Sequence, residues 1–241
     1  DIAGLVKLRR SRPDAADRRA AVAGLSLGEY AALCAAGVFD FADGMELVRI
    51  RGEAMSEAAK LRPQAMLSVA GLDEEVLQRM CDDQVVGGEV CQFANLLFPQ
   101  GVACSGTQSA IAALKRAAED AGAASARLLK TSGAFHTALM EPARLALGAA
   151  LRRLAPRMRP PVCDVYMNLT GAKVRAGTPP SELIPLLEKQ LVSPVLWSAS
   201  MQAMLRDGIQ EFYEVGPAKQ LRAMMRRIDA EAWQATTSLE I

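Results

Sequence analysis

The sequence predicts an α/β fold, in which a larger domain with a parallel sheet carries a smaller inserted subdomain of the ferredoxin-like type. Segments with the patterns of strands and of helices alternate along the chain, which is typical of α/β proteins. Between residues 61 and 130 these segments become short and follow the order βαββαβ, the order of a ferredoxin-like module. We therefore expect residues 1–60 and 131–241 to form the larger domain and residues 61–130 the subdomain.

The first sixty residues are expected to contain one strand among helices. Gly37 is a suitable C-terminal cap for one helix, and Asp40 can cap the N-terminus of the next. A short apolar run before Ser26 is typical of a buried strand. The expected elements are helices over residues 3–10, 27–36 and 40–59 and a strand over residues 20–24.

Glycine and proline divide the rest of the chain. Gly122 and Gly208 are expected to end helices, and Gly216-Pro217 separates a strand from the helix after it. In the subdomain we expect strands over residues 65–70, 90–94, 101–105 and 126–130 and helices over residues 73–81 and 108–121. Long helices return from Pro142, with strands near residues 162–167 and 211–215.

Composition argues against several classes of function. The 241 residues include 28 basic and 27 acidic side chains, and a net charge of +1 gives no footprint for nucleic acid or an anionic membrane. Neither a membrane span nor a signal peptide is predicted. The five cysteines form no C-x-x-C pair and have one histidine to join them, which argues against a zinc site and a secreted disulfide framework. We expect a soluble intracellular protein without a metal or cofactor.

Residues 24–28, Gly-Leu-Ser-Leu-Gly, match the G-x-S-x-G pattern of a nucleophile elbow, with Ser26 at its centre. Glycine leaves room for a tight turn between the strand and the helix. The N–H of Leu27, at the start of the helix, would point at a developing oxyanion. Because the chain has 18 glycines, a serine in an ordinary strand-to-helix turn is the alternative interpretation.

His136 is the only histidine, so any mechanism that uses an imidazole base depends on it. A serine hydroxyl is a weak nucleophile and needs an adjacent base. A hydrogen-bonded pair of Ser26 and His136 is therefore the favoured interpretation. Taken alone, a histidine beside Phe135 could equally be a partly buried residue bonded to the backbone.

The side chain of Arg51 is expected to project from the buried face of its helix, because the residues three and four positions away are apolar. They are Leu47, Val48, Ala54 and Met55. Arg49 instead lies between Glu46 and Glu53 on the exposed face. A buried guanidinium needs an anion. A structural carboxylate is the commoner partner, but the carboxylate of an acyl substrate would suit a serine–histidine site.

These residues belong to motifs that resemble the malonyl-CoA:acyl carrier protein transacylase family, the acyltransferases of fatty acid and polyketide synthesis. The resemblance extends over essentially the whole chain and rests on five motifs in the family's order. They are GLSLGEY at 24–30, LVRIRGEAM at 47–55, GAFHTALM at 133–140, KQLVSPVLW at 189–197 and EVGP at 214–217. The fold of the family, a hydrolase-like α/β domain with a ferredoxin-like insertion, agrees with the pattern described above.

The resemblance implies a role for each matched residue. Ser26 would carry the acyl group, His136 would act as base and then as acid, and Arg51 would bind the malonyl carboxylate. The N–H of Leu27 would form half of the oxyanion hole, and a backbone carbonyl at the motif of Gln190 would orient the histidine. Three further positions would contact substrate: Asn95, in the loop between the middle strands of the subdomain and near the pantetheine arm; Phe135, as in malonyl-selective members; and Met55.

The implied activity is malonyl transfer from malonyl-CoA to the phosphopantetheine thiol of acyl carrier protein, by a monomer. Leu25 replaces the histidine of many members, as in plant and plastid-type members, so a plastid is expected, with a mitochondrion or a bacterial cytoplasm as alternatives. Family members begin with a glutamine-containing loop that completes the oxyanion hole, and this chain starts beyond it, so we expect a fragment of a longer protein. A serine hydrolase or thioesterase, a non-catalytic fragment and a polyketide pathway are the alternatives.

Overall fold

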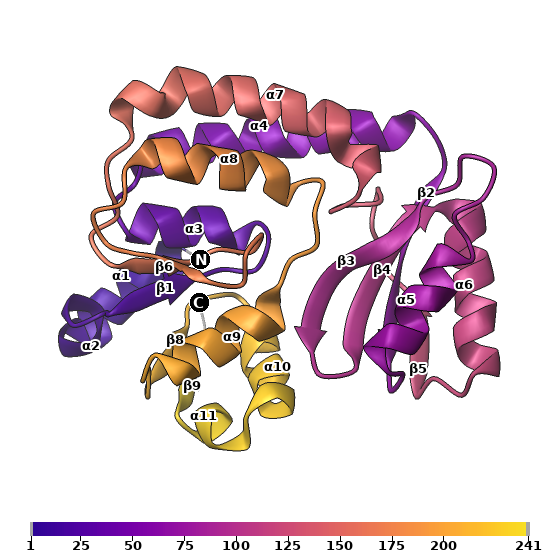
Figure 1. Cartoon of the computed structure of the whole chain (residues 1–241). Coiled ribbons are helices and arrows are strands. Elements are labelled where there is room, and N and C mark those ends of the chain that lie inside the picture. Colours follow the sequence, from indigo (N-terminus) through magenta and orange to yellow (C-terminus); the bar gives the residue numbers. More distant parts are fainter. Residues whose placement is uncertain (1, 240–241) are drawn as a thin grey trace.

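The computed structural model describes residues 2–239 and arranges their strands in three sheets (Figure 1). A four-stranded sheet and its two helices form one end of the molecule. Two smaller sheets lie at the other end, between a layer of long helices and a group of helices near the C-terminus. The fold is α/β with parallel and antiparallel sheets, as the sequence predicts.

The first part of the chain leads from two helices into a strand and then into two longer helices. The elements are α1 (Ile2–Ser11), α2 (Pro13–Asp17), β1 (Ala21–Ala23), α3 (Gly28–Ala35) and α4 (Phe41–Lys60). Both predicted caps are present: Gly37 has φ of 75°, and the Asp40 carboxylate accepts a 2.8 Å hydrogen bond from the N–H of Asp43. Helix α2 was not predicted, although a proline is favoured in the first turn of a helix.

Residues 64–128 form the four-stranded sheet and its helices in the predicted order βαββαβ. The elements are β2 (Gln64–Ala70), α5 (Glu74–Asp82), β3 (Cys91–Phe98), β4 (Gly101–Thr107), α6 (Gln108–Asp120) and β5 (Ser125–Leu128). The strands are antiparallel and lie in the order β3-β4-β2-β5. Leu67 and Val69 of β2 pack with Leu77 of α5 and Ile111 of α6 in one buried cluster. Both helices therefore cover one face of this sheet.

Strand β3 is longer than predicted, and this moves Asn95. The pairing of β3 with β4 continues to Phe98 through two register shifts. Asn95 therefore lies within a strand and not in the loop between the middle strands, which was the expectation. The loop itself is short, and Gln100 turns it with φ of 60°.

The last part of the chain contributes most of the remaining helices. The elements are α7 (Glu141–Leu154), β6 (Asp164–Tyr166), β7 (Lys173–Val174), α8 (Pro180–Gln190), α9 (Trp197–Arg206), β8 (Phe212–Glu214), α10 (Gln220–Ile228), α11 (Ala230–Gln234) and β9 (Thr236–Ser238), with 3₁₀ turns at Ala138–Met140 and Ala155–Arg157. Leu33 of α3, Leu47 of α4, Leu147 of α7 and Leu187 of α8 meet Val165 of β6 in the largest buried cluster. This core fixes α3 and α4 relative to the end of α8.

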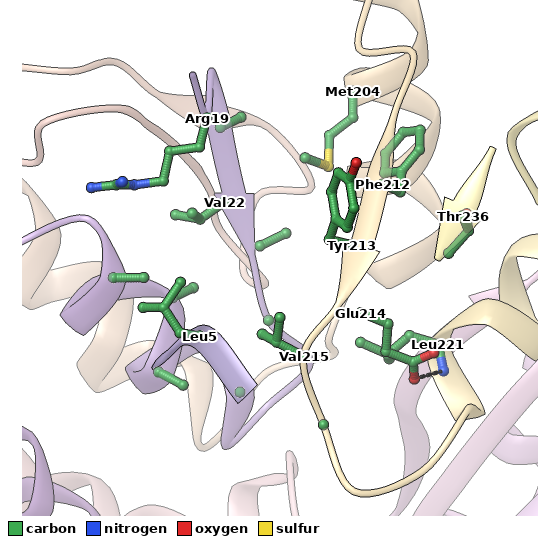
Figure 2. A pocket seen from close by; sticks show the side chains of 18 of the residues that line it. Leu5, Arg19, Val22, Met204, Phe212, Tyr213, Glu214, Val215, Leu221 and Thr236 are labelled. Carbon is green, nitrogen blue, oxygen red and sulfur yellow. Dashed lines mark hydrogen bonds between the residues drawn. The ribbon is translucent and has the colours of Figure 1, made fainter. Parts of the chain in front are cut away.

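The larger part of the molecule has the expected parallel strand pairing, but divided between two small sheets. β1 pairs in parallel with β6, β6 pairs antiparallel with β7, and β8 pairs in parallel with β9. β1 and β8 lie on opposite sides of a cavity of about 770 Å³, and no strand of residues 2–239 lies between them (Figure 2). The pattern of a single segment cannot reveal this, because pairing depends on strands far apart in the sequence.

Three further features of residues 2–239 bear on function. None of the helices in this range has the length and hydropathy needed to cross a membrane. The same range contains no group of three or more His, Cys, Asp or Glu side chains placed to hold a metal ion. All five cysteines are free thiols.

Candidate active site

Ser26 lies in the sharp turn between β1 and α3. Its φ of 53° is in the left-handed region, which costs a non-glycine residue about 1–3 kcal/mol. A Cβ on Gly24 would lie 2.0 Å from the carbonyl of Gly28, so the turn closes this tightly only with glycine at position 24. The turn thus has the strained strand-to-helix form of a nucleophile elbow.

His136 is hydrogen-bonded to Ser26 through one ring nitrogen and to the backbone through the other. Ser26 Oγ lies 2.8 Å from His136 Nε2, and His136 Nδ1 lies 2.8 Å from the carbonyl oxygen of Gln190. A carbonyl oxygen only accepts hydrogen bonds, so Nδ1 carries the ring proton and the lone pair of Nε2 faces the serine hydroxyl. His136 also has a positive φ, of 62°, so both members of the pair are held in strained backbone.

Burial keeps the histidine neutral. It lowers the pKa of His136 to about 4, against the opposing effect of the hydrogen bond to the Gln190 carbonyl. The nearby Arg51 charge lowers the pKa further. At neutral pH the ring is uncharged and able to accept the serine proton, which a general base requires.

Arg51 approaches the same hydroxyl from α4. Its Nη2 donates to Ser26 Oγ at 2.9 Å and to Gln190 Oε1 at 3.4 Å, while its buried Nε has no partner. Arg49 forms ion pairs with Glu46 and Glu53, whereas Arg51 forms none within residues 2–239. Burial lowers the pKa of Arg51. No carboxylate among the described residues forms an ion pair with Arg51, although the charge of the buried Glu29 is near enough to oppose this lowering of the pKa.

Leu27 lies beside this cluster with its backbone at the start of a helix. It is the N-cap residue of α3, and its side chain is 52% exposed. The first N–H groups of a helix lack partners within the helix, and the helix dipole places positive charge there. The N–H of Leu27 is therefore available to stabilise an anion next to Ser26.

The other three predicted contact residues have no hydrogen bond to this cluster. Met55 is buried in the core that surrounds α4, and Phe135 packs against both that core and the inner face of the four-stranded sheet. Asn95 forms an isolated parallel bridge with Val195, and its buried Oδ1 has no partner. Asn95 thus lies where the four-stranded sheet meets the chain before α9.

Two residues that the sequence analysis did not select complete the cluster. Asn168 Oδ1 accepts from the N–H of Ser26 at 2.6 Å, and Asn168 Nδ2 donates to the carbonyl of Gly24 at 2.7 Å. Glu29 accepts from the backbone N–H of Asn168 at 2.6 Å and from Gln190 Nε2 at 2.7 Å. Gln190 Nε2 also donates to the carbonyl of Ser26 at 3.0 Å. The elbow and the residue that orients His136 are therefore joined by one network.

Glu29 has the same sequence signal as Arg51, a charged side chain with apolar helix neighbours. Three and four positions after Glu29 on α3 are Ala32 and Leu33, so a carboxylate there points into a buried face. Asn168 carried no comparable signal, because its only local pattern is an Asn-Leu-Thr glycosylation sequence.

The large cavity lies behind the elbow and not at the reactive hydroxyl. Figure 2 shows Val22 of β1 facing Tyr213 of β8 and Val215 across this space. Gly24, Leu27 and Gly28 contribute to its wall, but Ser26, His136 and Arg51 do not. The reactive groups therefore lie in the hydrogen-bonded cluster and not in the wall of this cavity.

Comparison with known proteins agrees with this geometry. A profile of the acyl transferase domain family matches residues 15–236. The mitochondrial malonyl-CoA-acyl carrier protein transacylase of Homo sapiens is 35% identical over 251 aligned residues, covering 100% of this chain and 63% of that protein. The malonyl CoA-acyl carrier protein transacylase of Haemophilus influenzae is 37% identical, covering 86% of this chain and 64% of that protein. The chain thus spans a little under two thirds of the length of these relatives.

Solved structures give the same result. The crystal structure of an acyl-carrier-protein-S-malonyltransferase from Bartonella henselae superposes with a TM-score of 0.90 at 30% identity, covering 100% of this chain and 74% of that one. An acyl carrier protein S-malonyltransferase from Vibrio cholerae gives a TM-score of 0.89 at 32% identity, covering 99% and 76% of the two chains. The chain belongs to the acyl transferase domain family, that of the malonyl-CoA:acyl carrier protein transacylases.

Proposed function

We propose that the protein transfers a malonyl group from malonyl-CoA to the phosphopantetheine thiol of an acyl carrier protein through a malonyl ester on Ser26. The observation that carries this proposal is Arg51. A buried guanidinium with an unpaired Nε lies 2.9 Å from the nucleophilic oxygen and forms no ion pair within residues 2–239. Because a carboxylate accepts two parallel hydrogen bonds from arginine, an acyl group that carries its own carboxylate fits this place.

The first half-reaction follows from the positions of Ser26, His136 and Leu27. Ser26 Oγ attacks the thioester carbonyl carbon while its proton moves to His136 Nε2, and the new oxyanion accepts a hydrogen bond from the Leu27 N–H. The C–S bond then breaks, and the leaving sulfur of coenzyme A takes the proton from His136. Malonyl-Ser26 and free coenzyme A are the products.

The second half-reaction reverses these steps with a different thiol. The pantetheine thiol gives its proton to His136 Nε2 and attacks the ester carbonyl of malonyl-Ser26. The ester C–O bond breaks, and Ser26 Oγ recovers the proton from His136. The chain's own groups supply every proton transfer, so the proposal needs no cofactor.

The orientation of the histidine argues against a hydrolase on the same elbow. In the serine hydrolases that use a triad, a carboxylate orients the base. Here His136 Nδ1 faces the carbonyl oxygen of Gln190. A hydrolase of uncharged acyl groups would also gain nothing from Arg51.

The proposal is tested by the mass of the intact protein after incubation with malonyl-CoA. We expect addition of one malonyl group, its transfer to holo acyl carrier protein, and no addition in Ser26→Ala.

Arg51→Ala should lower acylation by malonyl-CoA by about 100-fold while acylation by acetyl-CoA is retained, because only malonyl carries a carboxylate. Equal loss with both thioesters would contradict the role of Arg51. If the wild-type protein forms no adduct with malonyl-CoA or with acetyl-CoA, the non-catalytic alternative is supported.

Several finer assignments belong to the same proposal. Asn95, Phe135 and Met55 are proposed to contact the substrate, with Asn95 nearest the pantetheine arm. Residues 61–130 are proposed as a subdomain inserted between residues 1–60 and 131–241, and the protein is proposed to act as a monomer. Fatty acid synthesis is the proposed pathway. A structure named as a type II polyketide acyl-carrier protein in complex with its malonyl-transacylase superposes with a TM-score of 0.87 at 29% identity, so a polyketide carrier protein is the alternative partner to assay.

The compartment is also proposed from the relatives. The human and mouse relatives are named mitochondrial, and others come from bacteria. We propose action in a mitochondrion or a bacterial cytoplasm. A plant or plastid-type member, the first expectation from the sequence, is supported only by Leu25 in the elbow.

A further inference from the structure

Glu29 is a buried carboxylate that the reaction proposed above does not use. It is 1% exposed. Because carboxylates are rarely fully buried without a partner, its partners indicate what holds it there. One of its oxygens accepts from the backbone N–H of Asn168 at 2.6 Å, and the other accepts from Gln190 Nε2 at 2.7 Å. Arg51 is close enough to influence its charge but forms no ion pair with it among residues 2–239. Two donors from distant segments therefore hold this carboxylate.

Both donors belong to residues that hold the reactive pair. The side chain of Asn168 bridges the elbow, because it accepts from the Ser26 N–H and donates to the Gly24 carbonyl. Gln190 orients His136 through its backbone carbonyl and donates to the Ser26 carbonyl through its side chain. One carboxylate thus joins the support of the nucleophile to the support of the base.

We propose that Glu29 and Asn168 are positioning residues, which hold Ser26 and His136 at the distance and angle needed for proton transfer. This inference rests on the proposed function, because it concerns the same nucleophile and base. Asn168 holds the strained turn at Ser26, whose φ is 53°, through its two hydrogen bonds across the elbow. Glu29 keeps Asn168 and Gln190 in a fixed relation, so a small shift of either would misalign the pair.

The network requires the ionised form of Glu29. Each of its oxygens faces a donor, and a protonated carboxyl would place its own O–H against one of them. Burial raises the pKa of Glu29 to about 7, opposed by the hydrogen bonds from Asn168 and Gln190 and by the charge of Arg51. The titratable or charged groups that face this cluster are Arg51 of α4, Tyr30 of α3 and His136.

A change of rate with pH follows from this arrangement. The pKa of His136 is about 4, so the base stays neutral down to that pH. As the pH falls through about 7, Glu29 takes up a proton and one hydrogen bond of the network is lost. The reactivity of Ser26 should therefore fall well above the pH at which His136 becomes charged.

A fluorophosphonate tests the pair without using malonyl-CoA. The reagent phosphonylates an activated serine with loss of fluoride, and His136 takes the proton of Ser26. The rate of labelling of Ser26 is measured from pH 5 to pH 9 by the mass of the intact protein. We expect the wild-type rate to fall as the pH drops through about 7 and the Glu29→Gln rate to be roughly 10- to 100-fold lower at pH 8. In Glu29→Gln the rate should no longer change between pH 6 and 8, because the group that titrates is gone.

Two further variants separate positioning from general stability. Glu214→Gln changes another buried carboxylate, 6% exposed, which caps α10 by accepting from the N–H groups of Leu221 and Arg222. It should lower the melting temperature but leave the pH profile unchanged. Asn168→Ala removes both bonds across the elbow and keeps the backbone N–H that faces Glu29. Its rate at pH 8 should fall by roughly 10- to 100-fold while the change near pH 7 persists.

Three outcomes would overturn the proposal. They are a Glu29→Gln protein that keeps the wild-type fall in rate near pH 7, a Glu214→Gln protein that loses that fall, and a folded Asn168→Ala protein with the wild-type rate. If Glu29→Gln gives no cooperative thermal transition, the variant is not folded, and the labelling rate of Asn168→Ala alone tests the proposal. Failure of malonyl transfer with normal fluorophosphonate labelling would contradict the proposed function but not this inference.

Discussion

Gly24 is the residue on which the shape of the elbow depends most directly. A Cβ at this position would lie 2.0 Å from the carbonyl carbon and the carbonyl oxygen of Gly28. These are backbone atoms, which cannot rotate away as a side chain could. We expect Gly24→Ala to lower the free energy of unfolding by about 1–3 kcal/mol and to abolish labelling of Ser26, because the turn must open. Urea unfolding and fluorophosphonate labelling measure the two effects.

Gly52 provides the matched control for this substitution. It lies in the interior of α4, and a Cβ there would meet nothing within 4 Å. Gly52→Ala should raise stability by roughly 0.5–1 kcal/mol, because alanine is the better helix former. Equal effects of the two substitutions would mean that the close approach at Gly24 carries no strain.

The residues that the sequence revealed are those whose chemistry is unusual in their setting. His136 was found because it is the only histidine, and Arg51 because its helix neighbours are apolar. Asn168 was not found, because an asparagine beyond a strand has no pattern that distinguishes it from a surface residue. Its role depends on a contact with Ser26, 142 positions away in the chain, that only folding creates.

Among the elements, α4 carries Arg51 into the site, and its N-terminus is fixed by Asp40. The Asp40 carboxylate accepts a hydrogen bond from the N–H of Asp43 at 2.8 Å. Asp40→Ala should lower stability by about 1 kcal/mol, which corresponds to a melting temperature about 2–4 °C lower for a chain of this size. Labelling of Ser26 should be unchanged, because Arg51 lies near the middle of the helix and is held by the core.

Calorimetry and fluorophosphonate labelling test this separation. Asp73→Ala is a comparable control, because Asp73 caps α5 by accepting from the N–H of Glu75, far from the reactive pair in the sequence. Both variants should lose similar stability. A selective loss of labelling in Asp40→Ala would show that the first turn of α4 controls the position of Arg51.

The sequence predicted well the elements that end at recognisable residues. The end of α3 just before Gly37, the start of α4 after Asp40 and the order of elements within residues 64–128 were predicted correctly. β7 and β9 were not, because their sequences, Lys-Val and Thr-Thr-Ser, contain no apolar run of the kind that indicated β1. β3 was predicted too short, since its pairing continues through irregular register that the alternation of side chains does not reveal.

For the whole molecule, the sequence predicted the fold class but not the division of the larger sheet. The alternation of strands and helices indicates an α/β protein without specifying which strands are neighbours. β1 pairs with β6, which lies about 140 residues later in the chain, and within residues 2–239 β8 pairs only with β9. The cavity of about 770 Å³ lies between β1 and β8.

This division predicts where the molecule is least stable. β4 is paired on both sides, by β3 and β2, and each of its residues is buried. β1 and β8 are each paired on one side, and the cavity lies along the other. Hydrogen exchange of the full chain should therefore be slowest at the amides of β4 and at least about 10-fold faster at those of β1 and β8, because local opening there breaks fewer contacts. Mass spectrometry of peptic peptides measures this order. Slower exchange at β8 than at β4 would mean that the cavity does not weaken the sheets around it.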